Sequence, residues 1–404
     1  MKILVFCQYY YPERFLLTDI AEELVRRGHE VTVVTGLPSY NLPGGKVPKE
    51  YRKGLHNNEC INGVRIIRCN TLGRGKSKIR MFLNYFSYVT KAKKLIDRLE
   101  KDYDIVFSYQ LTPVFQTLPA IEYAKRNDKK LVCYCLDLAP ESGLRMLRRI
   151  KPLANKYKKV SSDIYNSCDF VAVTSESFIN YHKEVNGVPE EKLVYIPQHA
   201  PTTLLKEDLT KCVQEGERKV FLFAGNVGVG AKLGTVVTAV KKLVDDGQVG
   251  FEVRIVGDGS DKSRLEQTVL DNALGDFVKF YDGVPFDRMP EVYRSADALL
   301  ITLRKGQITV PGKLQAYMST GKPIFGAMDS AGRDMINNSQ CGVCVPAESP
   351  DELAAVMNDF IENPERYSEY GENGRRYFED NFTLDRYITS LITLFNKAIA
   401  SEDE

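Results

Sequence analysis

Several features are missing from this 404-residue sequence. It contains no stretch of about 18 uncharged apolar residues, so no membrane-spanning helix is expected. The apolar run within MKILVFCQYYYP, residues 1–12, is too short for the core of a signal peptide. A net charge of only +2 excludes a strongly basic nucleic-acid-binding protein, and we expect no nucleic acid among the partners.

The nine cysteines lie mostly inside apolar runs such as VFCQ and LVCYCL. This placement is typical of reduced, buried thiols in a cytoplasmic protein. Cys341 and Cys344 have the spacing of a redox motif, but no second pair follows at the spacing of a zinc site. A structural role is therefore favoured over a redox or metal-binding role.

Short apolar runs alternate with helical patterns along the whole chain, which predicts an α/β fold. Strands are expected in KILVFC, EVTVVTG, VRIIRC, DIVFSY, KLVCYCLD, DFVAVTS and LVYIP, and then in KVFLFAGN, EVRIVGDG, VKFYDG, ALLITL, PIFGA and CGVCV. Continuous apolar strands indicate parallel sheets that are covered on both faces. We expect two Rossmann-like domains facing across a cleft, at residues 1–200 and 201–380. A C-terminal helix within 381–404 would pack back across that cleft.

Ligands bind beyond the carboxyl ends of parallel strands, so the residues that follow strands are candidate site residues. In FAGNVGVGAKLGT, residues 223–235, the glycines would let backbone amides approach a phosphate that Lys232 could also contact. The spacing differs from the dinucleotide motif G-x-G-x-x-G, and no acidic residue ends the next strand. A tight turn with a solvated lysine is the alternative.

Two carboxylates follow other strands. Asp258, in VGDG, could bind Mg²⁺ only with further carboxylates nearby, and turn or capping roles are favoured. Asp137, in CLDLAPES, ends a strand of the first domain and could accept a proton from a sugar hydroxyl. A helix cap is the alternative for Asp137.

The segment TVPGKLQAYMSTGKPIFGA, residues 309–327, combines a chain break with a short helix. Pro311 and Gly312 precede the helix, and Lys313 stands in its first turn. The positive end of a helix dipole disfavours a cation unless an anion is also present. Lys313 is therefore either solvated or paired with an anion such as a diphosphate.

Basic residues gather in two segments without acidic ones. Residues 74–94 and residues 145–159 each contain seven Lys or Arg side chains and no Asp or Glu. Either segment suits reversible docking to an anionic lipid leaflet. Two solvated helix faces are the alternative, and RNA is less favoured because no base-stacking motif accompanies the charge.

The ordered set of motifs resembles family 4 glycosyltransferases of the GT-B type, and in particular the fucosamine-transferase-like branch of O-antigen, colanic acid and capsule assembly. The motifs are YYYPERF with the following AEELVRRGHEVTVVTGLPSY (9–40), DLAPES (137–142), VTSESF (173–178), VYIPQHA (194–200), FAGNVG (223–228), VGDG (256–259), FYDGVPFDRMPEVYRSAD (280–297) and VPGKLQAYMSTGKPI (310–324). They extend over nearly the whole chain.

This resemblance implies a peripheral membrane enzyme that transfers a sugar with retention from a UDP-sugar, without a bound metal or other cofactor. The acceptor would be a polyprenyl-diphosphate-linked saccharide at the inner leaflet. By position, the donor-binding residues would be Asn226, Gly228, Lys232, Gly257, Gly283, Val284, Pro285, Pro311, Gly312, Lys313, Leu314 and Gln315. The catalytic candidates would be Asp137 and Glu13, and the membrane-facing residues Arg74, Lys76, Lys78, Arg80, Arg148 and Arg149.

One departure from the family pattern affects function. The Glu-x7-Glu pair of many members is replaced here by Ile308 and Ala316, which leaves Gln315 as the nearest polar side chain. A non-catalytic GT-B subunit that binds a nucleotide therefore stays open as an alternative. A UDP-sugar epimerase on the same architecture is a further alternative.

Overall fold

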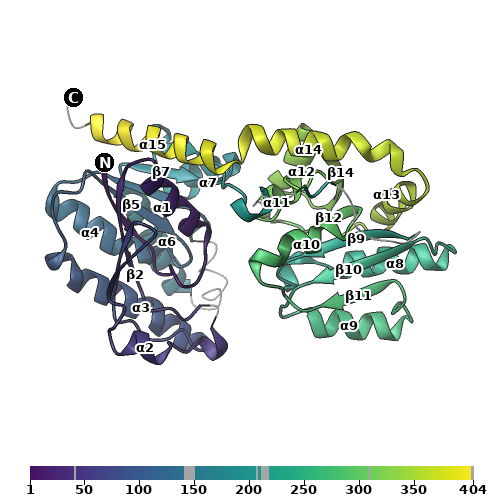
Figure 1. Ribbon diagram of the computed structural model, residues 1–404, viewed down its shortest axis with the longest axis horizontal. Helices are drawn as coiled ribbons and strands as arrows, with labels where there is room; N and C mark the ends of the chain where they lie inside the picture. The colour runs from purple at the N-terminus through teal and green to yellow at the C-terminus, as the bar shows by residue number, and fades with distance from the viewer. Residues whose placement is uncertain (41, 141–150, 206–207, 211–217, 308–309, 402–404) are drawn as a thin grey trace. The chain divides into compact units, whose positions relative to one another are not determined.

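The computed structural model describes residues 1–40, 42–140, 151–205, 208–210, 218–307 and 310–401. The chain divides into two compact units (Figure 1). Unit 1 comprises Met1–Pro197 and Leu384–Glu404, and unit 2 comprises Gln198–Thr383. The expected boundaries at residues 200 and 380 differ from these by a few residues.

Within the described residues, unit 1 contains an eight-stranded sheet in the order β3-β4-β2-β1-β5-β6-β7-β8. Its strands are β1 (Lys2–Phe6), β2 (Glu30–Thr35), β3 (Asn58–Ile61), β4 (Val64–Arg68), β5 (Ile105–Gln110), β6 (Leu131–Cys135), β7 (Phe170–Val173) and β8 (Leu193–Tyr195). All neighbouring strands are parallel except β3 and β4.

The antiparallel edge of unit 1 differs from the purely parallel sheet expected from the sequence. Strand β3 pairs with β4 from Asn58 opposite Ile67 to Ile61 opposite Val64. Asn62 and Gly63 form the connection, with φ angles of 50° and 80°. An Asn-Gly pair is the residue combination that favours a two-residue hairpin turn, because both positions require positive φ.

Helices cover both faces of the unit 1 sheet. They are α1 (Leu16–Arg26), α3 (Lys78–Leu95), α4 (Leu118–Asn127), α6 (Lys151–Asn166), α7 (Glu176–Asn186) and α15 (Leu384–Ala400), while the short helix α2 (Lys49–Arg52) has no buried residue. Helices α3, α4, α6 and α7 contribute to one core, and α1 and α15 contribute to the other. On α15, the ring of Phe395 lies 5.4 Å from that of Phe107 on β5, and the ring of Tyr387 lies 5.4 Å from that of Tyr134 on β6. The last helix is therefore part of the unit 1 core.

The described part of unit 2 contains a six-stranded sheet in the order β11-β10-β9-β12-β13-β14, and all its pairs are parallel. The strands are β9 (Lys219–Ala224), β10 (Phe251–Val256), β11 (Val278–Tyr281), β12 (Ala298–Thr302), β13 (Ile324–Ala327) and β14 (Gly342–Val345). The helices are α8 (Gly234–Asp245), α9 (Lys262–Asp271), α10 (Met289–Arg294), α11 (Leu314–Met318), α12 (Ala331–Ser339), α13 (Pro350–Glu362) and α14 (Ser368–Asn381).

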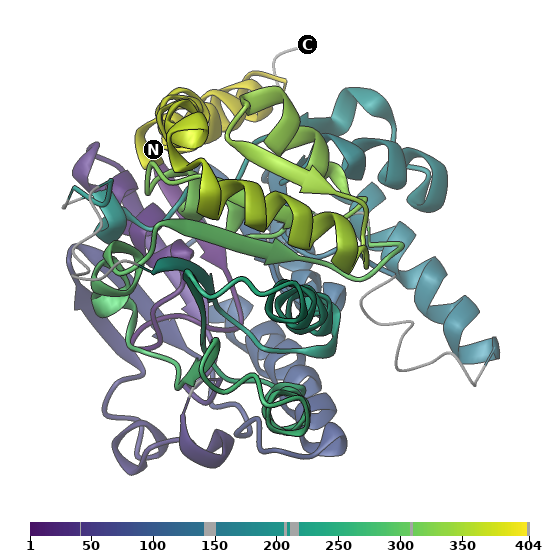
Figure 2. The ribbon, with the colours of Figure 1, turned by 90° about the vertical axis from the view of Figure 1, so that its right-hand side faces the viewer.

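Helices also cover both faces of the unit 2 sheet. Helices α8, α9 and α13 contribute to one core, and their stacking along the sheet is visible in Figure 2. Helices α10, α11, α12 and α14 contribute to the other. The six strands expected in this half are all present, and the expected α/β fold with two Rossmann-like domains is confirmed. None of the helices in the described ranges has the length and apolar character that crossing a membrane requires.

Candidate functional site

The candidate site of unit 2 lies where the strand order of the sheet reverses. From β9 the chain adds β10 and β11 on one side, and then β12, β13 and β14 on the other. Such a switch point, at the carboxyl end of the strands, is where open parallel sheets bind ligands. The segments that reach this point are Gly225–Gly228 after β9, and Leu303–Gln307 and Val310–Gly312 after β12.

Two glycine loops pack backbone against backbone at this edge. The N–H of Gly225 donates to the oxygen of Val256 at 2.9 Å, and the N–H of Val227 donates to the oxygen of Asp258 at 2.8 Å. A side-chain carbon at Gly257 would overlap the carbonyl oxygen of Gly225, and one at Gly259 would overlap the carbonyl group of Val227. The loops therefore require glycine at these positions, which also keeps their surface low enough for a ligand to reach backbone amides.

Lys313 brings its side-chain amine to the same edge. Its Nζ lies 3.5 Å from the centre of the Phe223 ring, and a side-chain carbon at Gly225 would lie 2.9 Å from that Nζ. Burial lowers the pKa of Lys313 to about 7. Among the residues that the structure describes, no carboxylate is paired with it. The aromatic face attracts the cation but cannot accept its three N–H donors as a carboxylate would, so these donors are available to an anionic ligand.

Helix α11 holds Lys313 in place. Lys313 is the N-cap of this helix. The sequence predicted it one position further along, in the first turn. Tyr317, one turn later, accepts the N–H of Ala224 at 2.9 Å through its hydroxyl group. Because Ala224 is the last residue of β9, this bond ties the start of α11 to the first glycine loop.

Three of the expected donor residues lie along the loop after β9. The side chain of Asn226 is exposed and lies over Gly228 and Gly259. Lys232 adopts a positive φ of 48°, and its Nζ lies 3.1 Å from a carboxylate oxygen of Glu348. Lys232 thus already has an anionic partner, in contrast to Lys313.

The segment expected to meet the nucleotide base follows β11. The N–H of Gly283 donates to Oδ2 of Asp258 at 3.1 Å, and this hydrogen bond and Lys262 lower the pKa of the Asp258 carboxyl group. Val284 is half-buried and Pro285 is exposed. Asp258 therefore links the loop after β10 to the loop after β11.

The remaining donor candidates surround the start of α11. Pro311 and Leu314 are buried, whereas Gly312 is exposed. Gln315 is also buried, and its Oε1 has no hydrogen-bond partner among the described residues. Ile308 lies outside the described residues. The structure thus brings Gly225, Gly257 and Lys313 together, and the ligand roles of all these residues stay predictions.

The two acceptor-side candidates lie at the carboxyl edge of the unit 1 sheet. Glu13, in the loop after β1, is buried, and its Oε2 accepts the N–H of Ser39 at 3.0 Å. Asp137, after β6, is exposed and accepts the hydroxyl group of Thr112 at 2.7 Å. Both carboxylates hold neighbouring loops, and their catalytic roles stay predictions.

The residues expected to face a membrane divide into two groups. Lys76, Lys78 and Arg80 are exposed. The guanidinium group of Arg74 is instead half-buried, 4.1 Å from the centre of the Tyr40 ring. Arg74 therefore packs into unit 1, which differs from the exposed position expected. Arg148 and Arg149 lie outside the described residues.

Cys341 and Cys344, the two cysteines at redox spacing, are buried thiols. Burial raises the pKa of both Cys341 and Cys344 to about 11, and neither forms a disulfide, which fits the structural role expected for them. In the parts of the chain that the structure describes, no three His, Cys, Asp or Glu side chains gather as metal ligands would.

Sequence reasoning missed Phe223 and Tyr317 as parts of this site. Both are buried aromatic residues in apolar segments, which resemble ordinary core residues. The signal that points to Phe223 is its position at the end of a strand, two residues before the first glycine of the loop.

Comparisons with known proteins agree with this architecture. A model of glycosyltransferase family 4 matches residues 15–202, and a model of glycosyl transferases group 1 matches residues 206–377. The chain is 23% identical to a protein named putative colanic acid biosynthesis glycosyl transferase WcaI from Escherichia coli strain K12, over 97% of this chain and 100% of that protein. It is also 23% identical to O-antigen chain mannosyltransferase C from Escherichia coli, over 100% of both chains.

A solved structure shares the fold. The crystal structure of Anabaena Alr3699/HepE in complex with UDP and glucose matches with a TM-score of 0.72 and 15% identity, over 98% of this chain and 100% of that chain. The two family models together span most of the sequence, and the switch-point geometry agrees with them. The chain therefore belongs to the family 4 glycosyltransferases with the GT-B fold.

Proposed function

We propose that this glycosyltransferase moves a sugar, with retention, from a UDP-sugar onto a polyprenyl-diphosphate-linked saccharide in bacterial surface polysaccharide assembly. It would act as a peripheral protein at the inner face of the plasma membrane. The names of the two relatives, which refer to colanic acid and O-antigen, support this class of product. The UDP bound to the matching Anabaena structure supports the donor.

The observation that carries the proposal is the desolvated ammonium group of Lys313 at the switch point. Its pKa of about 7 means that a bound anion gains more from this cation than from a hydrated surface lysine. A diphosphate placed there would meet Lys313 and the backbone amides of the glycine loop. The dipole of a helix terminus adds only about 0.3–1 kcal/mol, so contacts with the base, the ribose and the sugar must supply most of the affinity.

In the proposed reaction, the protein stabilises the charge of the departing diphosphate and positions the acceptor. When the bond between the sugar C1 and the diphosphate oxygen breaks, negative charge develops on that oxygen, and Lys313 stabilises it. The acceptor hydroxyl forms the new bond to C1 on the same face, and its proton passes to the departing diphosphate. Asp137 would then orient the acceptor.

A donor panel tests the proposal. The protein is incubated with several UDP-sugars and with GDP-mannose, with and without a membrane lipid extract, and the free nucleotide diphosphate is measured. We expect UDP release from one UDP-sugar that depends on the lipid extract, and a product with the same anomeric configuration as the donor. Release from GDP-mannose alone would overturn the UDP assignment.

The same panel separates the other function classes. Interconversion of UDP-sugars without an acceptor would indicate an epimerase, and UDP binding without any sugar transfer would indicate a non-catalytic subunit.

The variant Lys313→Ala should lower donor turnover at least about 100-fold while the far-UV circular dichroism spectrum is retained. Unchanged turnover in this variant would remove Lys313 from the donor site.

A further inference from the structure

Aromatic side chains gather at the carboxyl edge of the unit 1 sheet. Tyr9 and Phe15 follow β1, and Tyr40 follows β2. The rings of Phe15 and Tyr40 meet edge to face with their centres 5.5 Å apart, and Tyr40 is 43% exposed. The buried ring of Tyr9 supports both, since its centre lies 4.9 Å from that of Tyr40 and 6.2 Å from that of Phe15. Aromatic side chains at this edge of a parallel sheet are typical of a site for a small organic ligand.

The guanidinium group of Arg74, in the loop after β4, lies among these rings. It is 4.1 Å from the centre of the Tyr40 ring and 5.9 Å from that of Tyr85 on α3. Its Nη1 is buried and has no hydrogen-bond partner among the described residues. None of the described carboxylates is paired with Arg74. We call Arg74, Phe15, Tyr40 and Tyr85 the Arg74 cluster.

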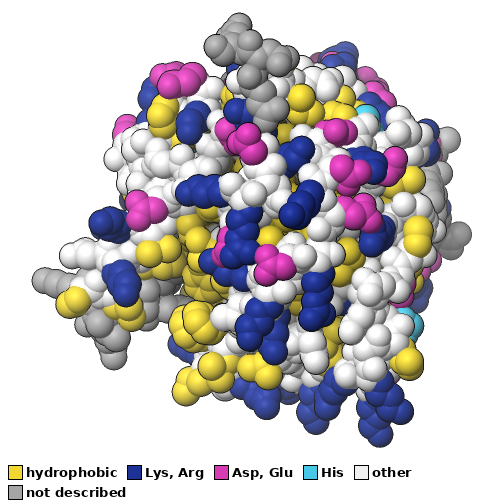
Figure 3. Space-filling view, turned by 90° about the vertical axis from the view of Figure 1, so that its left-hand side faces the viewer, with side chains coloured by type: hydrophobic (Ala, Val, Ile, Leu, Met, Phe, Trp, Pro, Cys, Tyr) yellow, Lys and Arg dark blue, Asp and Glu magenta, His cyan; other side chains and the backbone are white. Residues whose placement is uncertain are grey.

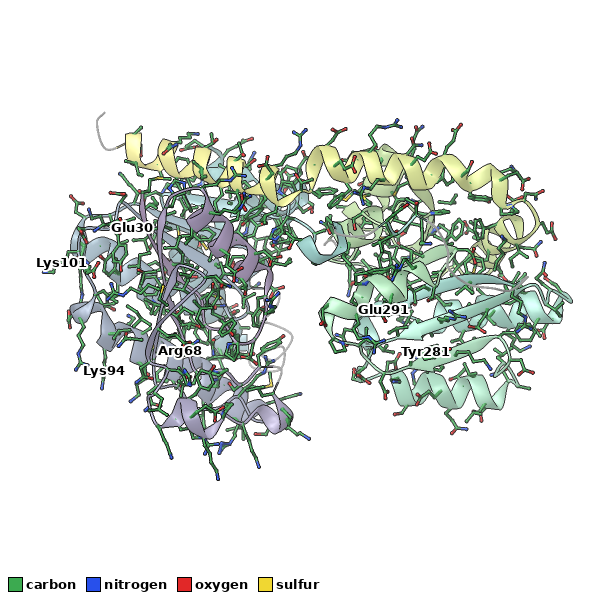
Figure 4. The ribbon with its side chains drawn as sticks, viewed as in Figure 1. Glu30, Arg68, Lys94, Lys101, Tyr281 and Glu291 are labelled. Carbon is green, nitrogen blue, oxygen red and sulfur yellow. The ribbon has the colours of Figure 1, made fainter. Side chains whose placement is uncertain are left out.

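A second arginine shows how unit 1 otherwise compensates a cation on an aromatic ring. The guanidinium group of Arg68, labelled in Figure 4, lies 5.2 Å from the centre of the Tyr51 ring. It is also paired with Glu59 and donates to two backbone carbonyl oxygens. Figure 3 shows several Lys and Arg side chains beside Asp and Glu side chains on the face of unit 1 that it presents. Arg74 differs from these cations because its charge has no described anionic partner.

The N–H donors of Arg74 match an anion with two oxygens. A guanidinium group is planar and always charged, and it carries its N–H donors in a rigid fork. An aromatic face attracts the cation but does not accept these in-plane donors, whereas a carboxylate or phosphate group accepts two of them in parallel. A half-buried cation without an anion is unfavourable. Binding of an anionic ligand would remove this cost.

Both acceptor-side candidates border the Arg74 cluster. Ser39 joins Glu13 to it, because its Oγ accepts the backbone N–H of Arg74 at 3.3 Å while its own N–H donates to Oε2 of Glu13 at 3.0 Å. Burial raises the pKa of Tyr85 most, and the carboxylate of Asp137 adds to the increase, so Asp137 lies close to Tyr85. The cluster therefore adjoins the residue proposed to orient the acceptor.

The chemistry of the cluster suits a sugar. A pyranose ring has C–H groups on its faces and hydroxyl groups at its edge. Its face can therefore pack on an aromatic ring while polar side chains bind its edge. The partly exposed rings of Phe15 and Tyr40 offer the first contact, and Asp137 and Arg74 offer the second.

We propose that the Arg74 cluster binds the acceptor sugar and selects an acceptor that carries an anionic group. Tyr40 and Phe15 pack against the face of the sugar ring, and Arg74 binds a carboxylate or phosphate group attached to it. This group is either the carboxylate of a uronic acid or the phosphate at C1 that joins a single sugar to its lipid. Both groups present two oxygens to the guanidinium fork.

This inference rests on the proposed function, because it names the class of acceptor that the enzyme would use. Its test uses neither a nucleotide nor a lipid. A failure of the sugar-binding test is thus separate from a failure of sugar transfer in the donor panel.

Saturation-transfer difference NMR on the full-length protein tests the proposal with small sugars. The anionic probes are the methyl glycosides of glucuronic and galacturonic acid, glucose 1-phosphate and galactose 1-phosphate. The neutral probes are methyl glucoside and methyl galactoside. We expect at least one anionic probe to bind at least about fivefold more tightly than its neutral counterpart. Binding of a uronate would assign the sugar carboxylate, and binding of the sugar phosphates alone would assign the linking phosphate.

Substitutions of Arg74 test the role of its charge and shape. Arg74→Met keeps an unbranched side chain and should weaken binding of the anionic probe at least about fivefold. Arg65→Met is the matched control, because Arg65 is half-exposed on β4 and paired with Glu100, and it should change binding less than about twofold. Circular dichroism checks the fold. If Arg74→Met does not fold, Arg74→Lys takes its place, since lysine keeps the charge but lacks the fork, and it too should weaken binding.

A second pair of substitutions tests the aromatic contact. Tyr40→Ala should weaken binding of the same probe, whereas Tyr281→Ala, at a position of unit 2 that is 46% exposed, should not. Lys313→Met removes the cation of the proposed donor site and should leave this binding unchanged.

Three outcomes would overturn the proposal. The first is equal binding of the anionic and neutral probes. The second is binding of the sugar phosphates that survives Arg74→Met but is lost in Lys313→Met, which would assign these probes to unit 2. The third is the absence of saturation transfer to every probe at about 10 mM.

Discussion

The hydroxyl oxygen of Tyr317 lies 2.9 Å from the backbone nitrogen of Ala224 and accepts its N–H. The two residues are far apart in sequence but meet at the switch point of unit 2. This hydrogen bond positions α11, and therefore Lys313, against the glycine loop that follows β9. The proposed donor site thus depends on a tertiary contact that no local motif contains.

Replacing Tyr317 with Phe should destabilise unit 2. The substitution leaves the buried N–H of Ala224 without a partner, and an unsatisfied buried group costs about 1–3 kcal/mol. Chemical denaturation measures the change in the free energy of unfolding. Tyr281→Phe is the matched control, because Tyr281 is 46% exposed at the end of β11 (Figure 4), and it should change stability by less than about 0.5 kcal/mol. Equal effects of both substitutions would contradict the assigned role of Tyr317.

Replacing Lys313 with Met should stabilise the protein while it impairs donor binding. The substitution removes a desolvated cation, and we expect the melting transition of unit 2 to rise by about 2–4 °C at pH 7. Burial holds the pKa of Lys313 at about 7, against an ordinary value of 10.5. The unfolded state therefore binds more protons between these pH values, so the gain from Lys313→Met is complete below pH 7 and disappears as the pH rises to 10.5.

Scanning calorimetry at pH 7 and pH 9 measures this gain, and titration calorimetry with UDP measures the loss of affinity. A variant that loses both stability and affinity would identify Lys313 as a structural residue instead of a ligand-binding one.

The affinity for UDP should fall as the pH rises above about 7. Under the proposed function, UDP binds the protonated form of Lys313, whose share decreases about tenfold per pH unit above its pKa in the free protein. Binding should also take up protons, which titration calorimetry detects as a dependence on the ionisation enthalpy of the buffer. Lys313→Arg keeps its charge over this range and should give a flat profile. A pH dependence that survives in Lys313→Arg would place the titrating group elsewhere.

Much of the fold follows from local sequence. Each strand expected in the second half is present, and the central strands β9 and β12 are apolar runs buried on both faces, as a parallel sheet covered by helices requires. The hairpin of β3 and β4 was not predicted, although the pair Asn62 and Gly63 is typical of a hairpin turn. Strand β3, with the sequence NECI, lacks the apolar character that the other strands share.

The site was less predictable than the fold. The glycine loops and Lys313 could be recognised, since glycine after a strand and a cation at a helix start are local signals. The ring of Phe223 under Lys313 and the hydrogen bond between Ala224 and Tyr317 could not be recognised from the sequence. Each contact joins segments roughly 90 residues apart and depends on how the sheet brings them together. The burial of Arg74 could not be predicted for the same reason. Its basic neighbours are exposed, whereas Arg74 packs against Tyr40.

The close packing of the glycine loops yields a further test. Gly259→Ala would push a methyl group into the carbonyl group of Val227, so we expect a destabilisation of about 1–3 kcal/mol and weaker UDP binding. Gly275→Ala is the control, because no atom lies within 4 Å of the added carbon. Denaturant unfolding of both variants measures the difference. If both tolerate alanine equally, the two loops are not in the tight contact described.

The position of α15 has a consequence for biosynthesis. Unit 1 begins with the first strand of the chain but takes Tyr387 and Phe395 from its last helix. During translation, the sheet of unit 1 leaves the ribosome with one apolar face covered by α1 but not by α15, and that face stays partly uncovered while all of unit 2 is made. The nascent chain would therefore need protection from aggregation throughout that interval. Unit 2, in contrast, is continuous in sequence and has every residue it requires before α15 emerges.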